Sequence, residues 1–339
     1  MEHLNKYTCV EKYGHVRGFS YFPSFGCNGI SLWVMNFDPE IFRFELRKGK
    51  EKFPSFNTVI LTLSFDAWCT DRETYLKNLD TAFAITTEEG LDAIPRYFNS
   101  CFGTPAFGGY TAECVQPHML PVYRKYMRDS LAVLADKRIL LHDISNEPLN
   151  NTYDSRPAQD RIYAFIQAMH EEIKACDSRP TTVGTQGYLP GEKESMQQGW
   201  TIASNVHNST DAVVDDIAFF FDFLDVITIH PYNIANLSQA EFERHFRSKL
   251  DYWEPMGKPI LITESCWADT NEDGRKNYLE SEIGTYKNVG IGFCCHVLAT
   301  SRVADCFPFD ERTEMKQGLY MAFLDENYEI RKHHDIFND

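Results

Sequence analysis

Residues 140–148 read LLHDISNEP, an apolar run that leads directly into a glutamate, Glu147. A second run of this kind, PILITES at residues 259–265, ends at Glu264. Near-continuous apolar runs are typical of parallel strands that are covered on both faces. In a closed barrel of such strands, catalytic groups lie at the carboxyl ends of the strands. The two glutamates are 117 residues apart (264 − 147 = 117), so only closure of a barrel brings them together.

Six further runs rich in β-branched and aromatic residues bring the expected strands to eight, the number that a closed (β/α)8 barrel requires. The expected strands are Val16–Phe22, Asn57–Phe65, Leu91–Phe98, Ile139–Ser145, Thr181–Gly187, Val226–His230, Ile260–Glu264 and Gly290–Leu298. We therefore expect an α/β fold, a (β/α)8 TIM barrel that forms a single domain over residues 1–339. A doubly wound open sheet is the alternative, but no G-x-G-x-x-G pattern follows the first strand.

Helical periodicity fills the intervals between these runs. One apolar stripe with i, i+3, i+4, i+7 spacing begins at Ile162, and Pro157 suits the first turn of that helix. Asp71 is the expected N-cap of a helix that contains Tyr75 and Phe83. The other expected helices are Pro39–Lys48, Leu120–Leu134, Ala212–Phe223, Gln239–Trp253, Arg275–Tyr286 and a last one near Lys316–Leu324. Strands that alternate with helices in this way favour one barrel over two domains.

The composition limits the classes of partner. The chain has 33 Lys and Arg against 49 Asp and Glu, a net charge of −16, which argues against nucleic acid and anionic membranes as partners. Its 43% of hydrophobic residues suffices for a large core. The sequence has no signal-peptide pattern and no apolar run that would span a bilayer. The ten cysteines form no C-x-x-C pair, so we expect a reduced, cytoplasmic protein; its oligomeric state is not readable from the sequence.

Paired carboxylates have a direct use in cleaving glycosidic bonds. The leaving oxygen needs a proton, and the developing oxocarbenium ion needs a nucleophile. Two carboxylates about 5 Å apart repel by roughly 3 kcal/mol at an effective dielectric near 20, which is about 2 pK units. That repulsion is enough to keep one carboxyl protonated near neutral pH, so one site can hold both an acid and a nucleophile.

Several motifs together resemble clan A of the retaining β-glycoside hydrolases, and most closely its family 5-like cellulase and mannanase members. The resemblance covers nearly the whole chain in the right order, and the two glutamate segments are its most specific parts. The matching segments are Arg17-Gly18-Phe19, Asn57-Thr58-Val59, Asn146-Glu147-Pro148, Arg179–Gly184, His230-Pro231-Tyr232 and the segment that ends at Glu264.

The resemblance implies a role for each matched residue. Glu147 would be the general acid/base, and Glu264 would be the nucleophile that forms a glycosyl–enzyme intermediate. Asn146 would bind the sugar 2-hydroxyl, while His230 and Tyr232 would orient the sugar and the nucleophile. The implied reaction needs no metal or other cofactor, and the implied substrate is a β-linked oligosaccharide or glycoside.

The sequence departs from the family pattern at three positions. Ile60 stands where the family usually has an arginine that supports the nucleophile, and Arg17 is the candidate replacement. His296 aligns with the strand-eight tryptophan that usually floors the sugar site, and His142 replaces a tryptophan in strand four.

Other residues are candidates to contact the sugar. Trp68 and Trp267 follow strand ends and have the aromatic rings that suit stacking on a pyranose. Asn99 follows strand three and His118 lies in the long segment after it, so both can reach sugar hydroxyls. His296 completes this expected set.

Two other functions fit the same barrel. The missing arginine and tryptophan suit a carbohydrate-binding pseudoenzyme. The second alternative is a metal-dependent hydrolase or isomerase, although the sequence has no His-x-His or His-Glu-x-x-His pattern to support it. Its ligands would come from Asp143, Glu147, His230, Glu264 and His296.

Overall fold

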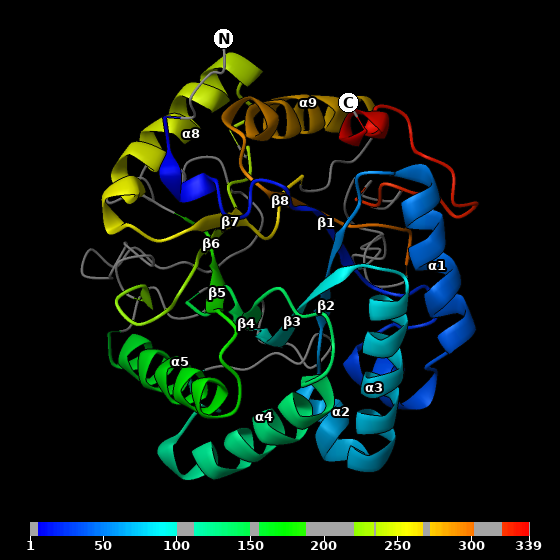
Figure 1. Cartoon of the computed structure of the whole chain (residues 1–339), viewed down its shortest axis with the longest axis vertical. Coiled ribbons are helices and arrows are strands. Elements are labelled where there is room, and N and C mark those ends of the chain that lie inside the picture. The colour runs from blue at the N-terminus through cyan, green and yellow to red at the C-terminus, as the bar shows by residue number, and fades with distance from the viewer. Residues whose placement is uncertain are drawn as a thin grey trace, which may run out of the picture.

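The strands form a closed barrel in a computed structural model that describes residues 6–99, 112–149, 156–187, 220–233, 235–266, 272–301 and 321–338. The eight strands pair in sequence order, every pair is parallel, and β1 pairs with β8 to close the ring (Figure 1). The expected (β/α)8 fold is therefore confirmed. The strands are β1 (Arg17–Tyr21), β2 (Thr58–Thr62), β3 (Asp92–Asn99), β4 (His142–Asn146), β5 (Thr181–Thr185), β6 (Ile227–Ile229), β7 (Ile260–Ile262) and β8 (Phe293–His296).

Most strands are shorter than the apolar runs that predicted them. Ile291 and Leu298, for example, are fully buried but lie outside the β8 ladder. Apolar runs report burial, and buried residues continue beyond the ends of the regular strand. The predicted second strand ran to Phe65, whereas Ser64 is the N-cap of a short helix and accepts a hydrogen bond from the Ala67 N–H.

The helices surround the barrel as an outer layer (Figure 1). They are α1 (Pro39–Lys52), α2 (Phe65–Thr70), α3 (Arg72–Glu88), α4 (Leu120–Leu134), α5 (Arg156–Cys176), α8 (Gln239–Trp253) and α9 (Glu272–Val289). Shorter helical turns are η1 (Thr8–Val10), η2 (Ser31–Met35), η5 (Pro117–Met119), η6 (Glu254–Met256) and η7 (His334–Phe337). Asp71 caps α3 as expected, with its carboxylate accepting from the Thr74 N–H.

Two expected helices need comment. Most of Ala212–Phe223 lies outside the described residues. The helix expected near Lys316–Leu324 is wrong over its described part, because Leu324 forms β-bridges with Ala299 and Ile330. Among the described residues, no helix combines the length and apolar character that crossing a bilayer requires.

The interior of the barrel changes from apolar to polar along the strands. Near the amino ends, eight inward-facing residues form an apolar cluster: Tyr13, Val16, Ile60, Ile94, Leu141, Val226, Leu261 and Cys294. Side chains alternate along a strand, so the residue two positions further on faces the same way. In six strands that next residue is polar: Thr62, Arg96, Asp143, Thr228, Thr263 and His296. The polar end of the barrel is the end from which Glu147 and Glu264 extend.

Candidate active site

Glu147 lies at the carboxyl end of β4, where the backbone leaves regular strand geometry. The β4–β5 register shifts between Asp143 and Asn146, and Glu147 itself has a left-handed φ of 42°. Its N–H donates to the Gly184 carbonyl at 2.7 Å. A left-handed backbone is costly for a residue with a side chain, so this conformation must be held by its surroundings. It directs the carboxylate toward the barrel axis.

His230, which follows β6, binds the Glu147 carboxylate. Its Nδ1 lies 2.9 Å from Glu147 Oε1, and its Nε2 lies 3.2 Å from the Thr263 hydroxyl. Gly184 makes room for the ring, because a Cβ at that position would come within 2.6 Å of His230 Nε2. His230 therefore orients Glu147, whereas the resemblance implied that it would orient the sugar and the nucleophile.

Glu264 follows β7 and is held by residues from β3 and from the segment after β6. Arg96 Nη1 donates to Glu264 Oε2 at 3.1 Å, and the Tyr232 hydroxyl donates to Glu264 Oε1. His296 Nδ1, on β8, lies 3.8 Å from the same Oε1. The carboxylate is 7% exposed, so these neighbours make up most of its environment.

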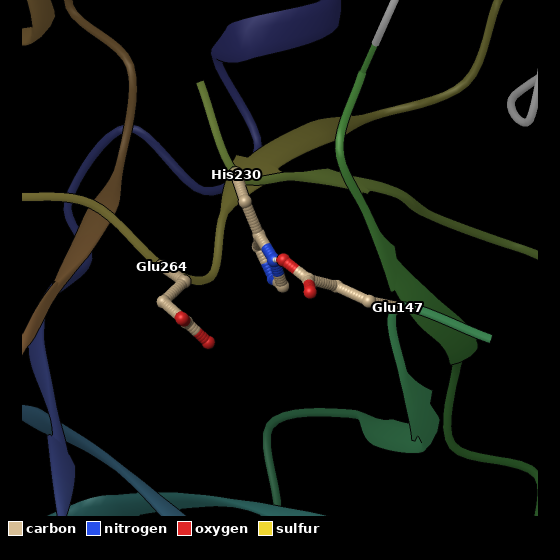
Figure 2. A group of neighbouring side chains, drawn as sticks. All are labelled: Glu147, His230 and Glu264. Carbon is tan, nitrogen blue, oxygen red and sulfur yellow. Dashed lines mark hydrogen bonds and ion pairs between the residues drawn. The ribbon is translucent and has the colours of Figure 1, made fainter. Parts of the chain in front are cut away.

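Glu147 and Glu264 face each other across the barrel mouth although they come from β4 and β7 (Figure 2). One carboxylate oxygen from each lies within 4.8 Å of the other and of a His230 ring nitrogen. Barrel closure thus brings together the two glutamates that the sequence separates by 117 residues (264 − 147 = 117).

The environment of Glu264 favours its ionised form. Burial alone would raise the pKa of this carboxyl, but the imidazoles of His296 and His230 and the guanidinium of Arg96 lower it to about 2. Burial lowers the pKa of His296 to about 4, so that ring is neutral at pH 7. The positive charge beside Glu264 at pH 7 is therefore that of the Arg96 guanidinium. Burial and the nearby carboxylates raise the pKa of Tyr232 well above its usual value, which keeps its hydroxyl a donor. Glu264 is therefore an anion at neutral pH.

Arg96 belongs to this candidate site although no sequence motif pointed to it. It is 3% exposed and bridges two buried carboxylates, with Nε 2.7 Å from Asp143 Oδ2 and Nη1 on Glu264. Asp143 also accepts from the Gly184 N–H at 3.2 Å, so the network joins β3, β4 and β5. The signal was present, since a buried arginine inside a strand needs carboxylate partners.

The prediction that Arg17 replaces the missing arginine is wrong. Arg17 begins β1, at the amino end of the barrel, and Nη1 donates to the Gly14 and Val16 carbonyls. Its guanidinium lies 4.7 Å from the Phe293 ring centroid. Ile60 is part of the apolar cluster inside the barrel. Arg96 on the adjacent strand therefore supplies the positive charge that position 60 lacks.

The remaining predicted contacts divide between the site and the surface. Asn146 Nδ2 donates to Asn99 Oδ1 at 3.3 Å, so both amides lie at the carboxyl ends of β3 and β4 beside Glu147. His118 is exposed in η5, immediately before α4, and no contact joins it to either glutamate among the described residues. Trp267 lies outside the described residues.

The prediction that Trp68 is a sugar platform is also wrong. Trp68 lies on α2 and is only 8% exposed. Helix α2 belongs to the outer layer (Figure 1). Its Nε1 donates to Asp129 Oδ2 at 3.0 Å, and its ring stacks on Phe65. A platform for a pyranose needs an open ring face, whereas the Trp68 ring packs on Phe65 of the same helix and its indole nitrogen joins α2 to Asp129 on α4.

We expect Trp68→Phe to lower stability without changing catalysis. The variant loses the indole hydrogen bond to Asp129 and some packing volume, which together cost about 1–2 kcal/mol in the free energy of unfolding. Thermal unfolding measures the first effect, and steady-state kinetics measure KM on whichever glycoside the protein turns over. A tenfold rise in KM with unchanged thermal stability would contradict this expectation and indicate that Trp68 contacts the sugar.

The donor set at the barrel mouth is poorly suited to a divalent cation. Glu147, His230 and Glu264 are the described residues whose nitrogen and oxygen atoms lie close enough together to suggest one. The Arg96 guanidinium, however, already compensates the charge of Glu264 and of Asp143, and it repels a second cation. Both ring nitrogens of His230 contact protein oxygens. The arrangement fits acid–base chemistry better than metal binding.

Comparisons with known proteins identify relatives in fold. No protein-family model and no curated protein sequence matches the chain. Among solved structures, the exo-β-1,4-mannosidase Op5Man5 from Opitutaceae bacterium strain TAV5 matches with a TM-score of 0.68 at 15% identity, over 97% of this chain and 61% of its own. GH5_18 from Streptomyces cattleya in complex with GlcNAc matches with a TM-score of 0.64 at 14% identity, over 95% of this chain and 79% of its own.

A β-glucuronidase from Ruminococcus gnavus, in complex with D-glucaro 1,5-lactone, matches with a TM-score of 0.60 at 14% identity. That match covers 96% of this chain, which spans about half (49%) of the glucuronidase. At these identities the likeness concerns the fold, so the chain shares its (β/α)8 barrel with glycosidases that are named for different sugars.

Proposed function

We propose that the protein is a retaining β-glycoside hydrolase in which Glu147 is the general acid/base and Glu264 is the nucleophile. The observation that carries this proposal is the separation of the two carboxylates, with oxygens within 4.8 Å of each other. Retaining enzymes place their carboxyl groups about 5–5.5 Å apart, whereas inverting enzymes leave about 6.5–9.5 Å for a water molecule.

The two glutamates would act in turn in a double displacement. In the first step, protonated Glu147 gives its proton to the glycosidic oxygen while ionised Glu264 attacks the anomeric carbon, and the aglycone alcohol leaves. In the second step, the Glu147 carboxylate takes a proton from water as that water attacks the anomeric carbon. This step breaks the bond to Glu264 and restores both side chains. Arg96 and Tyr232 stabilise Glu264 as the anion that each cycle begins and ends with.

Other residues would position the substrate. Asn146, beside Glu147, would bind the sugar 2-hydroxyl, with Asn99 fixing its amide. His296 reaches toward Glu264 from β8 and would lie under the sugar ring. The substrate would be a β-linked oligosaccharide or a simple glycoside. The proteins with a similar fold include a mannosidase and a glucuronidase. The panel of test substrates must therefore include manno-, gluco- and glucurono-configured glycosides.

The experiment that tests this function is a screen of aryl β-glycosides and short β-linked oligosaccharides, with proton NMR of the first sugar released. We expect hydrolysis of at least one substrate and a β-anomer as the initial product. An α-anomer as the first product would indicate an inverting mechanism and would contradict the retaining one. Sugar binding by calorimetry without turnover across the panel would instead identify a binding protein.

We expect Tyr232→Phe to shift the acid limb of the pH profile upward. The Tyr232 hydroxyl donates to ionised Glu264, and hydrogen bonds to charged groups contribute about 1.5–3 kcal/mol. Its loss favours protonation of Glu264, so the pKa rises and the ionised fraction at acid pH falls. The acid limb of kcat/KM therefore moves up by about 1 pH unit or more.

Tyr75→Phe is the matched control for this measurement. The Tyr75 hydroxyl is also buried but lies 3.5 Å from the Tyr126 hydroxyl, away from both glutamates. We expect its pH profile to coincide with that of the native protein. An acid limb that stays in place in Tyr232→Phe would show that Glu264 does not control it.

A further inference from the structure

Side chains on the inner face of α9 bind the segment after β6, which carries Tyr232, and the segment after β7, which carries Glu264. Glu282 is completely buried on this helix. Its Oε1 accepts the Asn233 N–H at 2.7 Å, and its Oε2 accepts the Cys266 N–H at 2.6 Å. Asn233 directly follows Tyr232, and Cys266 lies two residues after Glu264. One carboxylate therefore joins the segment after β6 to the segment after β7.

Neighbouring residues on α9 strengthen the same connection. Arg275 Nη1 donates to the Cys266 carbonyl at 3.0 Å, so α9 side chains hold both backbone polar groups of Cys266. Cys266 has a left-handed φ of 60°, a conformation that favours glycine and is costly for cysteine. The Tyr286 hydroxyl donates to the Pro231 carbonyl at 3.2 Å, which fixes the first segment at a second point.

We propose that Glu282 is a positioning residue that sets the distance between Tyr232 and Glu264 by binding the backbone of both segments at once. The inference rests on the proposed function, in which Glu264 is the nucleophile. The Tyr232 hydroxyl reaches Glu264 only if the two segments keep their present spacing. A shift of about 1 Å in a reacting group can cost a hundredfold in rate.

The two hydrogen bonds require Glu282 as a carboxylate, because a protonated oxygen would turn a donor toward an N–H. Burial nevertheless raises the pKa of Glu282 to about 7, against the effect of its backbone hydrogen bonds and of Arg275. The other titratable groups that face it are Tyr286 on α9, Cys266 after β7 and Tyr232 after β6. Burying an ionisable group costs stability, so packing alone does not account for a glutamate at this position.

The test compares Glu282→Gln with Glu45→Gln in the full chain. Gln keeps the size of Glu but can accept at only one of its two terminal atoms, so one backbone N–H loses its partner. Glu45 is the matched control, since it is equally buried on α1 and accepts from Tyr21, Ser24 and Tyr328. These contacts lie outside the segments that carry Glu147 and Glu264.

Two measurements are made on both variants. The first is deuterium uptake, by mass spectrometry, in peptides that contain Asn233 or Cys266. We expect faster uptake in at least one of these peptides in Glu282→Gln and native uptake in Glu45→Gln. The second is steady-state kinetics, in which we expect kcat to fall about 10- to 100-fold in Glu282→Gln with KM within about threefold of native. Glu45→Gln should keep native kcat even where its thermal stability falls.

The outcomes separate the inference from the proposed function. Native uptake in both peptides, or native kcat in Glu282→Gln, would overturn the positioning role. An equal fall of kcat in Glu45→Gln would reduce the effect to general stability and also overturn it. If the native protein hydrolysed no glycoside, the proposed function would fail, and deuterium uptake alone would decide whether Glu282 holds the two segments.

Discussion

We expect Glu264→Ala to lower kcat on aryl β-glycosides by about 10⁵-fold, because the variant has no group to attack the anomeric carbon. Arg96 and Tyr232 bind this carboxylate, and Asp143, the other acid that Arg96 binds, is completely buried. The measurement is initial-rate kinetics on the best substrate from the glycoside panel. Glu264→Gln is the control for packing, since it preserves volume and an acceptor for Tyr232 but not the charge.

Azide identifies the role of the missing carboxylate. In Glu264→Ala, azide can enter the space that the carboxylate leaves and attack from the same side. With a good leaving group that needs no protonation, we expect azide to restore turnover and give the α-glycosyl azide. Unchanged hydrolysis in Glu264→Ala without azide would remove Glu264 as nucleophile and with it the proposed mechanism.

The two glutamates were predictable because their signal is local. An apolar run that ends in a glutamate places the side chain at the carboxyl end of a buried strand, and barrel closure does the rest. The strand pairing supports this argument. The residues two positions after the apolar cluster are mostly polar, and they lie between that cluster and the two glutamates. Side chains alternate between the two faces of any strand, so the face on which each residue lies can be predicted from the sequence alone.

Residues that act across the fold were harder to predict. Arg96 lies in a run that reads as apolar strand, and its partners Asp143 and Glu264 are 47 and 168 residues away in the sequence. The family pattern pointed to position 60 and then to Arg17, which belongs to the opposite end of the barrel. Glu282 shows the same limit, since only tertiary packing reveals that its two oxygens bind separate segments.

The error at Trp68 has a different cause. The apolar run after residue 57 predicts a strand that continues to Phe65, which places Trp68 just past the strand, at the mouth of the barrel. Ser64 instead caps α2, and the helix carries the tryptophan into the outer layer. A serine followed two residues later by an aspartate is a helix-start signal that competes with the strand pattern.

We expect Glu147→Ala to slow hydrolysis by about 10²- to 10⁴-fold on substrates with poor leaving groups, the range that general acid catalysis contributes. Glu147 supplies the proton to the leaving oxygen, so the loss should shrink as the leaving group becomes more acidic. On a dinitrophenyl glycoside the first step needs no proton, and the glycosyl–enzyme intermediate on Glu264 should accumulate as a burst of released phenol. A loss that is equal for all leaving groups would contradict this role.

The azide product then distinguishes the two glutamates from each other. In Glu147→Ala the intermediate on Glu264 still forms, so azide attacks from the side opposite to Glu264 and gives the β-glycosyl azide. Glu264→Ala should give the α-product with the same donor, because the vacant side is reversed. The two carboxylates lie within 4.8 Å of each other, so loss of activity alone does not assign their roles, whereas the configuration of the azide does. A β-product from Glu264→Ala and an α-product from Glu147→Ala would exchange the two roles on the same barrel.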